Sequence, residues 1–563
     1  MRHWLLAGFT LLSSQVLANT TLFHNVQGYT PTLQGGLEQF NVLVVKDGKV
    51  VKIGDDTLLK QFPEATRHDV MGRTMLPGLI DAHGHVVGLG NNLVELDLRG
   101  KRSIEEIGEA LRDYSKTFEG DWIIGRGWDQ NLWPSQQFGN AQDLDKYLAD
   151  KPVVLTRVDG HAVWVNTKAM SIAGINAQTA APAGGEIIHL PDGTPSGVFI
   201  DKAEGLIQAH IPAASQPAVA KALHTAGEHL LSLGITATHD AGIDYTTWQV
   251  YLQEAKNKTL PLRIYAMLSA ADPYLDKMLD AGVVKDPNDY LAIRSVKIYA
   301  DGALGSRGAA LLDSYKDRPG HHGLMLETPE HLQELLRKAF KHGFSANTHA
   351  IGDKANRIVL DAYEAEFKKT GGKLLRNRIE HAQIVEPSDI PRFKQLQIIP
   401  SMQPVHATSD MHMAEQRLSD KQLAGGYAWQ TFLKQGSKVA AGSDFPVELA
   451  EPFHGLYSAI TRQDSQGLPE QGWRASEVLS REQALRAFTL DAAYAGFQEH
   501  KIGSLEQGKW ADFIVLDADY FKVPVKAIHD IQVEETWMAG KLVFKRQEQS
   551  ANSETDAAST AQP

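Results

Sequence analysis

The chain has 563 residues, 43% of them hydrophobic and 22% charged, so it is long enough for a sizeable core and more than one domain. The formal net charge is −12 and no basic face is evident, which argues against nucleic acid or an anionic membrane as a partner. Cysteine is absent, so disulfides and thiolate chemistry are excluded, and any metal must be bound by histidine, carboxylate or modified lysine.

The two ends of the sequence are predicted to lie outside the folded part. Residues 1–18 resemble a signal peptide, with an apolar run from Trp4 to Leu12 and the small-residue triplet Val16-Leu17-Ala18. We therefore expect cleavage near Asn19 and export to the periplasm or the medium, and no later stretch is apolar enough for a transmembrane helix. Residues 547–563, rich in Ser, Thr, Ala and Gln, are predicted to be a disordered tail.

Next to each of these ends, the sequence is predicted to form short β-strands. Residues 42–54 form two apolar runs around an Asp-Gly pair, the pattern of a hairpin. Similar apolar runs return at residues 511–516 and 534–544. We therefore predict that residues 19–74 and 501–546 fold together into one small β-sandwich.

Between these segments, residues 75–500 alternate apolar strand-like runs with helical segments such as 329–342 and 354–369, the pattern of βα units. The predicted strands lie at residues 75–85, 234–239, 262–267, 295–299, 344–349, 378–381, 398–403 and 438–444. The predicted fold is an α/β fold with a (β/α)8 TIM barrel. Residues 98–224 are too long for a loop after the first strand and are predicted to be an inserted domain over the mouth of the barrel.

Possible metal ligands follow several of these strands. Asp81, His83 and His85 alternate along the first strand and therefore point to one side of it. Functional groups of such barrels lie at the C-terminal ends of strands. The candidates at these ends are His83, His85, Lys297, His349, His381 and Asp444. Any one histidine could be an ordinary core residue, and Asp444 could cap a turn, but their joint placement predicts a site for a divalent ion such as zinc.

Several longer motifs are more specific than any single ligand. They are Pro77-Gly-Leu-Ile-Asp-Ala-His-Gly-His85, Gly127-Trp-Asp-Gln130, Arg157-Val-Asp-Gly-His-Ala162, Gly234-Ile-Thr-Ala-Thr-His-Asp240, Lys297-Ile-Tyr-Ala-Asp-Gly302, Thr348-His-Ala-Ile-Gly-Asp353, Ile379-Glu-His-Ala-Gln383, Gly442-Ser-Asp-Phe-Pro446 and Gly503-Ser-Leu-Glu-Gln-Gly-Lys-Trp-Ala-Asp512. With these motifs the chain resembles the amidohydrolase superfamily and, within it, the amidohydrolase-3 or YtcJ-like group, which includes N-substituted formamide deformylase-like enzymes. The resemblance is specific for the family and much less so for the substrate.

The resemblance implies how the candidate ligands divide between metal ions. His83 and His85 would bind one ion, His349 and His381 would bind a second, and Asp444 would contact the first. Asp444 would also take a proton from water and pass it to the leaving nitrogen.

Lys297 resembles a lysine that is carbamylated in many members of the family and bridges two ions. A neutral lysine amine can add carbon dioxide and so become an anionic oxygen donor. The alternative is that Lys297 neutralises Asp301 or lines the mouth of the barrel, in which case the site holds one ion.

Residues that choose the substrate are expected mainly in the insert. Apolar surface and positive charge for a small-ligand pocket are supplied by Trp122, Trp128, Trp133, Trp164, Arg126, Arg157 and His161, although the tryptophans could instead form the core of the insert. His239 or His161 could help to stabilise an oxyanion. Arg157 or Arg307 could pair with a substrate carboxylate, which would make N-acyl amino acids candidates.

We therefore predict a metal-dependent amidohydrolase that hydrolyses the non-peptide C–N bond of an N-substituted formamide or another N-acyl compound by metal-activated hydroxide. The alternatives are a D-aminoacylase or cyclic amidase of the same superfamily, or a non-catalytic small-molecule-binding or regulatory relative. The complete ligand set favours an enzyme. The expected partner is a small-molecule amide, and a homodimer is a further expectation.

Overall fold

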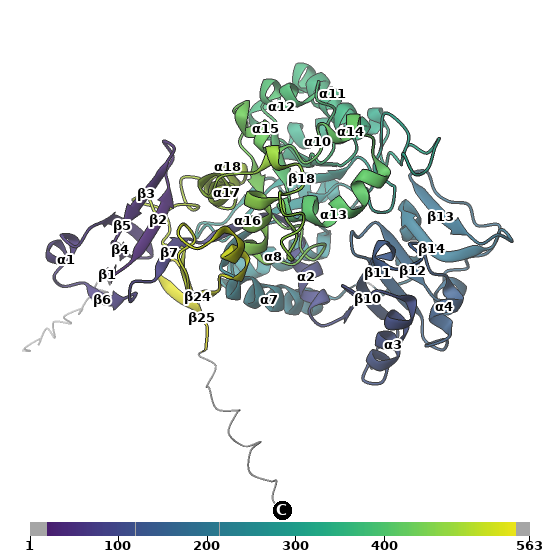
Figure 1. The fold of residues 1–563 in the computed structure, drawn as a ribbon, viewed down its shortest axis with the longest axis horizontal. Helices are drawn as coiled ribbons and strands as arrows, with labels where there is room; N and C mark the ends of the chain where they lie inside the picture. Colours follow the sequence, from purple (N-terminus) through teal and green to yellow (C-terminus); the bar gives the residue numbers. More distant parts are fainter. Residues whose placement is uncertain (1–19, 119, 213, 548–563) are drawn as a thin grey trace, which may run out of the picture.

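The computed structural model describes residues 20–118, 120–212 and 214–547. The predicted signal peptide, residues 1–18, and nearly all of the predicted tail, residues 548–563, lie outside this range. The described chain has a central barrel with a group of β-strands on one side and the inserted sheet on the other (Figure 1). None of the described helices is both long and apolar enough to cross a membrane.

Two β-sheets lie beside the barrel, one built from the N-terminal part alone and one built from both ends of the described chain (Figure 1). The first sheet, in the order β5-β4-β1-β6, contains β1 (Thr20–His24), β4 (Val42–Lys46), β5 (Lys49–Gly54) and β6 (Thr66–Asp69), with α1 (Leu58–Gln61) before β6. The second, in the order β25-β24-β23-β7-β2-β3, contains β2 (Gln27–Pro31), β3 (Leu37–Phe40), β7 (Thr74–Pro77), β23 (Phe513–Leu516), β24 (Val533–Met538) and β25 (Lys541–Lys545), with the 3₁₀ turn η5 (Val525–Asp530) before β24. Met75 of β7 pairs with Val515 of β23, so the two ends fold together.

Turn chemistry and aromatic packing explain how these sheets form. The β4–β5 hairpin turns at Asp47 and Gly48, whose φ angles of 52° and 77° are both positive, as a two-residue turn of this kind requires. Phe23 of the first sheet packs against Phe513 and Trp537 of the second, with ring centroids 4.9 Å away in each case. These contacts form a core that the two sheets share.

The central part of the molecule is a nearly closed barrel of eight parallel strands. In barrel order they are β8 (Leu79–Gly84), β15 (Ile235–Ile243), β16 (Arg263–Ser269), β18 (Leu291–Tyr299), β19 (Ser345–Ala350), β20 (Arg378–His381), β21 (Ile399–Met402) and β22 (Ala440–Ala441), with β17 (Val284–Lys285) antiparallel to β18. A parallel bridge between Gly84 and Phe445 joins the last strand to the first. Each barrel strand overlaps one of the predicted stretches, so the predicted α/β barrel is confirmed.

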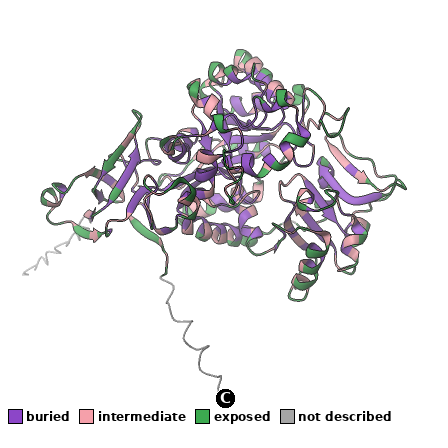
Figure 2. Ribbon diagram, viewed as in Figure 1, coloured by how far each residue is buried: buried purple, intermediate pink, exposed green. Residues whose placement is uncertain are grey.

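Helices surround the barrel, and Figure 2 shows that their exposed residues lie on the outer surface while the strands are buried. They are α2 (Val86–Asn92), α7 (Gln216–Ser232), α8 (Tyr245–Asn257), α9 (Leu275–Asp280), α10 (Pro329–Lys341), α11 (Asp353–Thr370), α12 (Ile390–Leu396), α13 (Pro404–Arg417), α14 (Asp420–Leu423), α15 (Trp429–Lys434), α16 (Pro452–Thr461), α17 (Arg481–Ala487) and α18 (Leu490–Ala495), with the 3₁₀ turns η3 (Lys373–Leu375) and η4 (Ala475–Glu477). In α10, Thr328 caps the first turn by accepting from His331 N, and Leu332 and Leu336 are buried.

The residues between β8 and β15 form a separate six-stranded sheet in the order β13-β14-β12-β11-β10-β9. Its elements are β9 (Leu96–Asp97), α3 (Ile104–Ser115), β10 (Ile123–Trp128), η1 (Gln130–Leu132), α4 (Ala141–Asp145), β11 (Val153–Arg157), β12 (Ala162–Val165), α5 (Thr167–Ile172), β13 (Gly185–His189), β14 (Pro195–Asp201), η2 (Lys202–Glu204) and α6 (Gly205–Gln208). We predicted that the insert ends at His224, but α7 continues through this residue and packs against α2. The insert therefore ends before α7.

Candidate metal centre

A cavity of about 570 Å³ lies where the C-terminal ends of the barrel strands face the insert. The barrel contributes His83, His85, Lys297, His349, His381, His406 and Asp444 to its lining, and the insert contributes Arg126, Asp129, Arg157, Asp159 and His161. The cavity contains all six residues that were predicted as metal ligands. Its size suits a small organic ligand.

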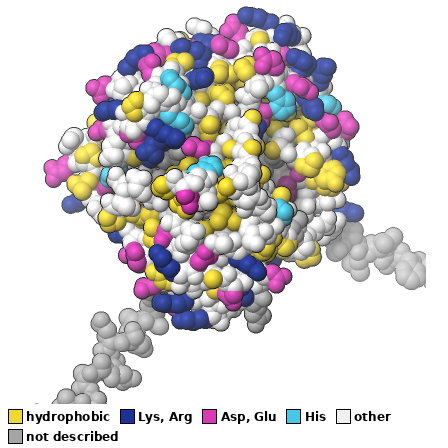
Figure 3. Space-filling view, turned by 90° about the vertical axis from the view of Figure 1, so that its right-hand side faces the viewer, with side chains coloured by type: hydrophobic (Ala, Val, Ile, Leu, Met, Phe, Trp, Pro, Cys, Tyr) yellow, Lys and Arg dark blue, Asp and Glu magenta, His cyan; other side chains and the backbone are white. Residues whose placement is uncertain are grey.

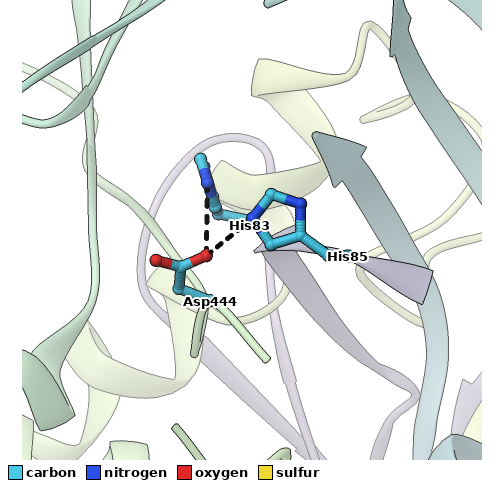
Figure 4. Close-up of side chains that lie close together, drawn as sticks. All are labelled: His83, His85 and Asp444. Carbon is cyan, nitrogen blue, oxygen red and sulfur yellow. Dashed lines mark ion pairs between the residues drawn. The ribbon is translucent and has the colours of Figure 1, made fainter. Parts of the chain in front are cut away.

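His83, His85 and Asp444 form one possible set of metal ligands (Figure 4). His85 Nε2 lies 3.1 Å and His83 Nε2 lies 3.5 Å from Asp444 Oδ1. Each residue offers one ligand atom, and these three atoms lie within 4.8 Å of one another. The first and last strands of the barrel thus bring the three ligands together.

Asp81 holds these two strand ends in place. Its carboxylate accepts hydrogen bonds from Ser443 N at 2.9 Å, from Ser443 Oγ at 2.7 Å and from His83 N at 3.0 Å. A Cβ atom at Gly442 would lie 2.4 Å from Asp81 Oδ1, so this approach requires glycine. Asp81 therefore positions the residue before Asp444 and the backbone of His83.

A second set of possible ligands consists of His381, His406 and again Asp444. His381 Nδ1 lies 2.8 Å from Gln403 Oε1, which leaves the other ring nitrogen free to bind an ion. His406 was not among the ligands predicted from the sequence. It lies in the first turn of α13, just beyond the predicted strand 398–403, and a search of the residues that follow each strand would have found it.

His349 and Lys297 lie next to these two sets but belong to neither. The ring centroid of His349 is 4.5 Å from that of His381, and Lys297 Nζ is 3.1 Å from His83 Nε2. The structure thus brings together all six residues that were predicted as ligands, in one cavity.

The buried nitrogen atoms of this centre fit a metal ion. Within the part of the chain that the structure describes, His349 Nε2 and His406 Nε2 are buried and have no hydrogen-bond partner. Buried polar atoms are seldom left in this state. Imidazole nitrogen and carboxylate oxygen are the donors that zinc and related divalent ions prefer, so these residues suit such an ion.

The protonation states of the centre also suit metal binding. Burial lowers the pKa values of His349 and His381 well below the ordinary histidine value, so both rings are neutral at pH 7. Burial raises the pKa of the Asp444 carboxyl, but the imidazoles of His83 and His85 outweigh burial and hold this pKa below its ordinary value. Neutral imidazoles and an ionised carboxylate are the forms that bind metals.

Lys297 and Glu380 are charged groups that contact opposite nitrogen atoms of the His83 ring, Nε2 and Nδ1 respectively. Burial lowers the pKa of Lys297 to about 8. Glu380 Oε2 lies 2.6 Å from His83 Nδ1, an arrangement that orients a ligating imidazole and increases its basicity. Glu380 is a further residue of the site that the sequence analysis did not identify.

On the insert side, charged groups are held by ion pairs. Arg157 pairs with Asp129 and Asp159. His161 Nδ1 lies 2.7 Å from Asp201 Oδ1, and its ring centroid is 5.2 Å from that of His349. Burial lowers the pKa of His161, but the hydrogen bond and charge of Asp201 dominate and raise it to about 9. The predicted residues Arg157 and His161 therefore line the cavity with their partners already in place.

Three other predicted substrate residues lie elsewhere. Trp128 lies in the core of the insert, where its Nε1 donates to Leu155 O at 2.7 Å. His239 is buried inside the barrel, with its ring centroid 4.9 Å from that of Tyr265. Arg307 forms an ion pair with Asp317 at 2.7 Å. The structure does not bring these three side chains to the cavity.

Comparisons with a family model and with known proteins show which proteins this chain is similar to. A model of the amidohydrolase family matches residues 68–544. Protein LONG AFTER FAR-RED 3 of Arabidopsis thaliana is 32% identical over 95% of this chain and 92% of its own length. The putative amidohydrolase YtcJ of Bacillus subtilis is 31% identical over 93% and 99%, and the N-substituted formamide deformylase of Arthrobacter pascens is 26% identical over 90% and 95%.

A solved structure is also similar. The crystal structure of an uncharacterized metal-dependent hydrolase from Pyrococcus horikoshii superimposes with a TM-score of 0.73 at 26% identity, covering 90% of this chain and 99% of that one.

Proposed function

Because this chain belongs to the amidohydrolase family, we propose that it is an enzyme that hydrolyses a non-peptide C–N bond in a small amide, with the aid of a bound divalent ion. The substrates that we favour are N-substituted formamides and related N-acyl amines. The observation that carries the proposal is the cluster of four histidines around Asp444 at the C-terminal mouth of the barrel. These four are His83, His85, His381 and His406.

The proposed ion is zinc, held by His83, His85 and Asp444, with a second ion at His381, His406 or His349. A divalent ion of this kind polarises a carbonyl group and lowers the pKa of water from about 15.7 to about 7. The ionised carboxylate of Asp444 can accept a proton from the attacking water. It can then donate that proton to the leaving nitrogen, which is otherwise a poor leaving group.

Lys297 and His161 have supporting roles in this proposal. The Nζ atom of Lys297 is buried beside His83, a place from which its carbamate could reach two ions. His161 is fixed at Nδ1 by Asp201 and therefore can present Nε2–H to an oxyanion that forms in the cavity. Neither role changes the class of reaction.

The other functions considered from the sequence are less well supported. The D-aminoacylase and cyclic amidase alternatives are not favoured by the relatives described above. A non-catalytic relative need not keep a buried aspartate between two sets of histidines, as this chain does.

Hydrolysis by metal-depleted and metal-reloaded protein tests the proposal. The protein is treated with a chelator, divided, and incubated with or without zinc before it is given a panel of N-substituted formamides and N-acetyl amines. We expect release of amine only after reloading. No release from any amide, with any of zinc, manganese, cobalt or nickel, would contradict the proposed function.

Export and self-association remain predictions. We propose that the chain is cleaved near Asn19 and exported, on the strength of residues 1–18, and that it forms a homodimer. Mass spectrometry of the mature N-terminus tests the first statement, and light scattering of the purified protein tests the second.

A further inference from the structure

Three arginines line the described cavity, and two of them already have carboxylate partners. Arg99 is hydrogen-bonded to both oxygen atoms of Asp97, at 2.9 and 2.8 Å. Arg157 is bracketed by Asp129 and Asp159. The third arginine, Arg126 on β10, forms no ion pair with any residue that the structure describes.

The guanidinium group of Arg126 is only partly satisfied. Its Nη2 donates to the backbone oxygen of Val158 at 3.0 Å. Its Nε is buried and has no hydrogen-bond partner among the described residues. Arginine stays charged in proteins and has five N–H donors arranged to bind a carboxylate with two parallel hydrogen bonds. A buried guanidinium without a carboxylate therefore has unused capacity to bind one.

Two other carboxylates that line the same cavity, Asp159 and Asp410, are engaged elsewhere. Asp159 uses one oxygen for Arg157 and accepts at the other from His161 N at 3.0 Å. Asp410, which also lines the cavity, accepts from Gln383 and Tyr427, each at 2.7 Å. Asp444, which also lines the cavity, belongs to both possible sets of metal ligands, so a bound ligand can supply the anion for Arg126.

Arg126 and the reaction centre belong to one cavity. Burial lowers the pKa of Arg126, and the nearby carboxylates of Asp444, Asp159 and Glu204 oppose this effect. The charge of Asp444 thus acts on the guanidinium although the two residues come from different parts of the fold, the barrel and the insert. On the face that Figure 3 shows, acidic and basic side chains are mixed, with no single basic patch.

We propose that Arg126 binds an ionised carboxylate of the substrate, so that the preferred substrates are amides that carry a carboxylate near the scissile C–N bond. This inference rests on the proposed amide hydrolysis and deepens it, because it adds a substrate charge that neutral N-substituted formamides lack. It also assigns the carboxylate site to a residue other than Arg157 or Arg307, both of which are neutralised by aspartates.

Matched pairs of substrates test the proposal. The first pair is N-formylphenylalanine, in both enantiomers, and N-formylphenethylamine, which lacks only the carboxylate. The second pair is N-benzylsuccinamic acid and N-benzylbutyramide, in which the carboxylate lies on the acyl side. We expect the metal-loaded protein to prefer the acid in at least one pair by about 10- to 100-fold in kcat/KM, the range for hydrogen bonds to a charged group.

Variants of Arg126 show whether that preference depends on this residue. In Arg126→Gln, the preference should fall to about 1, while hydrolysis of the neutral member persists and shows that the protein is folded. Arg126→Lys should keep part of the preference, because it keeps the charge but loses the paired donors. The matched control is Arg99→Gln, which removes another arginine from the cavity lining and should leave the preference unchanged.

Two results would overturn the inference. One is equal hydrolysis of acid and neutral members by the wild-type protein. The other is an equal loss for both members in Arg126→Gln. If no amide is hydrolysed, the proposed function fails and calorimetry still decides about Arg126. In that case, metal-loaded protein should bind N-formylphenylalanine or N-benzylsuccinamic acid, and Arg126→Gln should weaken this binding by about 10-fold or more; no binding of either acid rejects the site.

Discussion

The polar side chains on the barrel side of the cavity differ from those on the insert side in whether they have partners. On the barrel side, His349 and His406 have buried ring nitrogens without hydrogen-bond partners. On the insert side, Arg157 and His161 are each fixed by aspartates. A side chain that binds a metal must leave one donor atom free for the ion. A side chain that recognises a substrate is more selective when its own partners hold it in place. From this difference we propose that the reaction takes place on the barrel side and that the insert selects the substrate.

The largest expected effect comes from Asp444→Asn. The amide keeps the size of the carboxylate but cannot accept the proton of the attacking water. General acid–base catalysis contributes about 100- to 10,000-fold, so we expect kcat for amide hydrolysis to fall by a factor in this range. Asp313→Asn, which alters an exposed carboxylate paired with Lys421, is the control and should keep wild-type kcat. Undiminished activity in Asp444→Asn would remove the aspartate from the mechanism.

Trp164→Ala tests whether metal binding by the barrel is independent of the insert, because this substitution should destabilise the insert. Trp164 is fully buried, and its Nε1 donates to Asn140 O at 2.9 Å. Removing such a side chain costs about 3–5 kcal/mol, so amide hydrogens of the insert should exchange faster while those of the barrel strands do not. Metal content should stay at the wild-type level.

The control for this variant is Trp248→Ala, which removes an indole from α8 of the barrel. It should leave hydrogen exchange in the insert unchanged. Loss of metal from Trp164→Ala would show that the insert helps to hold the ion, against the assignment made above.

Glu380→Gln should lower the metal affinity of the barrel side, with a smaller effect than the preceding substitutions. Burial raises the pKa of Glu380, but the charge of His83 and the hydrogen bond to it dominate, so Glu380 is ionised and orients His83. Loss of such a partner typically lowers metal affinity by about 10- to 100-fold. Competition with a chromophoric chelator measures this affinity, with the exposed Glu364→Gln as the control. Equal affinity in both variants would show that Glu380 does not tune the centre.

The smallest effect is expected for Arg307→Gln. Arg307 pairs with Asp317 away from the cavity, and ion pairs near the surface contribute about 0–1 kcal/mol. The melting temperature should therefore barely change, and the preference between acidic and neutral amides should not change at all. A loss of that preference would transfer the carboxylate site from Arg126 to Arg307.

The main elements of the fold could be predicted because local patterns specify them. The periodicity of residues 329–342 and 354–369 matches α10 and α11 to within one residue at each end, and the turn residues Asp47 and Gly48 mark the hairpin. The end of the insert at residue 224 was misplaced because α7 is continuous through it and its packing on α2 is a long-range contact.

The ligands could be predicted where they lie at or near the ends of strands. His83 lies near the end of β8 and Asp444 lies shortly after β22, whereas His406 lies in the helix that follows β21 and has no pattern of its own. An aromatic residue such as Trp128 is typical of a pocket wall. Its burial in the core of the insert depends on tertiary packing, which the spacing of residues in the sequence does not predict. Arg126 could be named as a pocket residue, but the sequence did not show that Arg157 already has carboxylate partners and Arg126 does not.

Metal content of the full-length protein, purified without chelator and measured by mass spectrometry, tests the central claim most directly. The variants to compare are His83→Ala, His406→Ala and, as a control, His342→Ala, which alters a histidine on a barrel helix outside the cavity. We predict one or two divalent ions per chain in wild-type and His342→Ala protein, and a loss of metal together with amide hydrolysis in the other two variants. Unchanged metal content in His83→Ala and His406→Ala, or hydrolysis that survives complete removal of metal, would contradict the account.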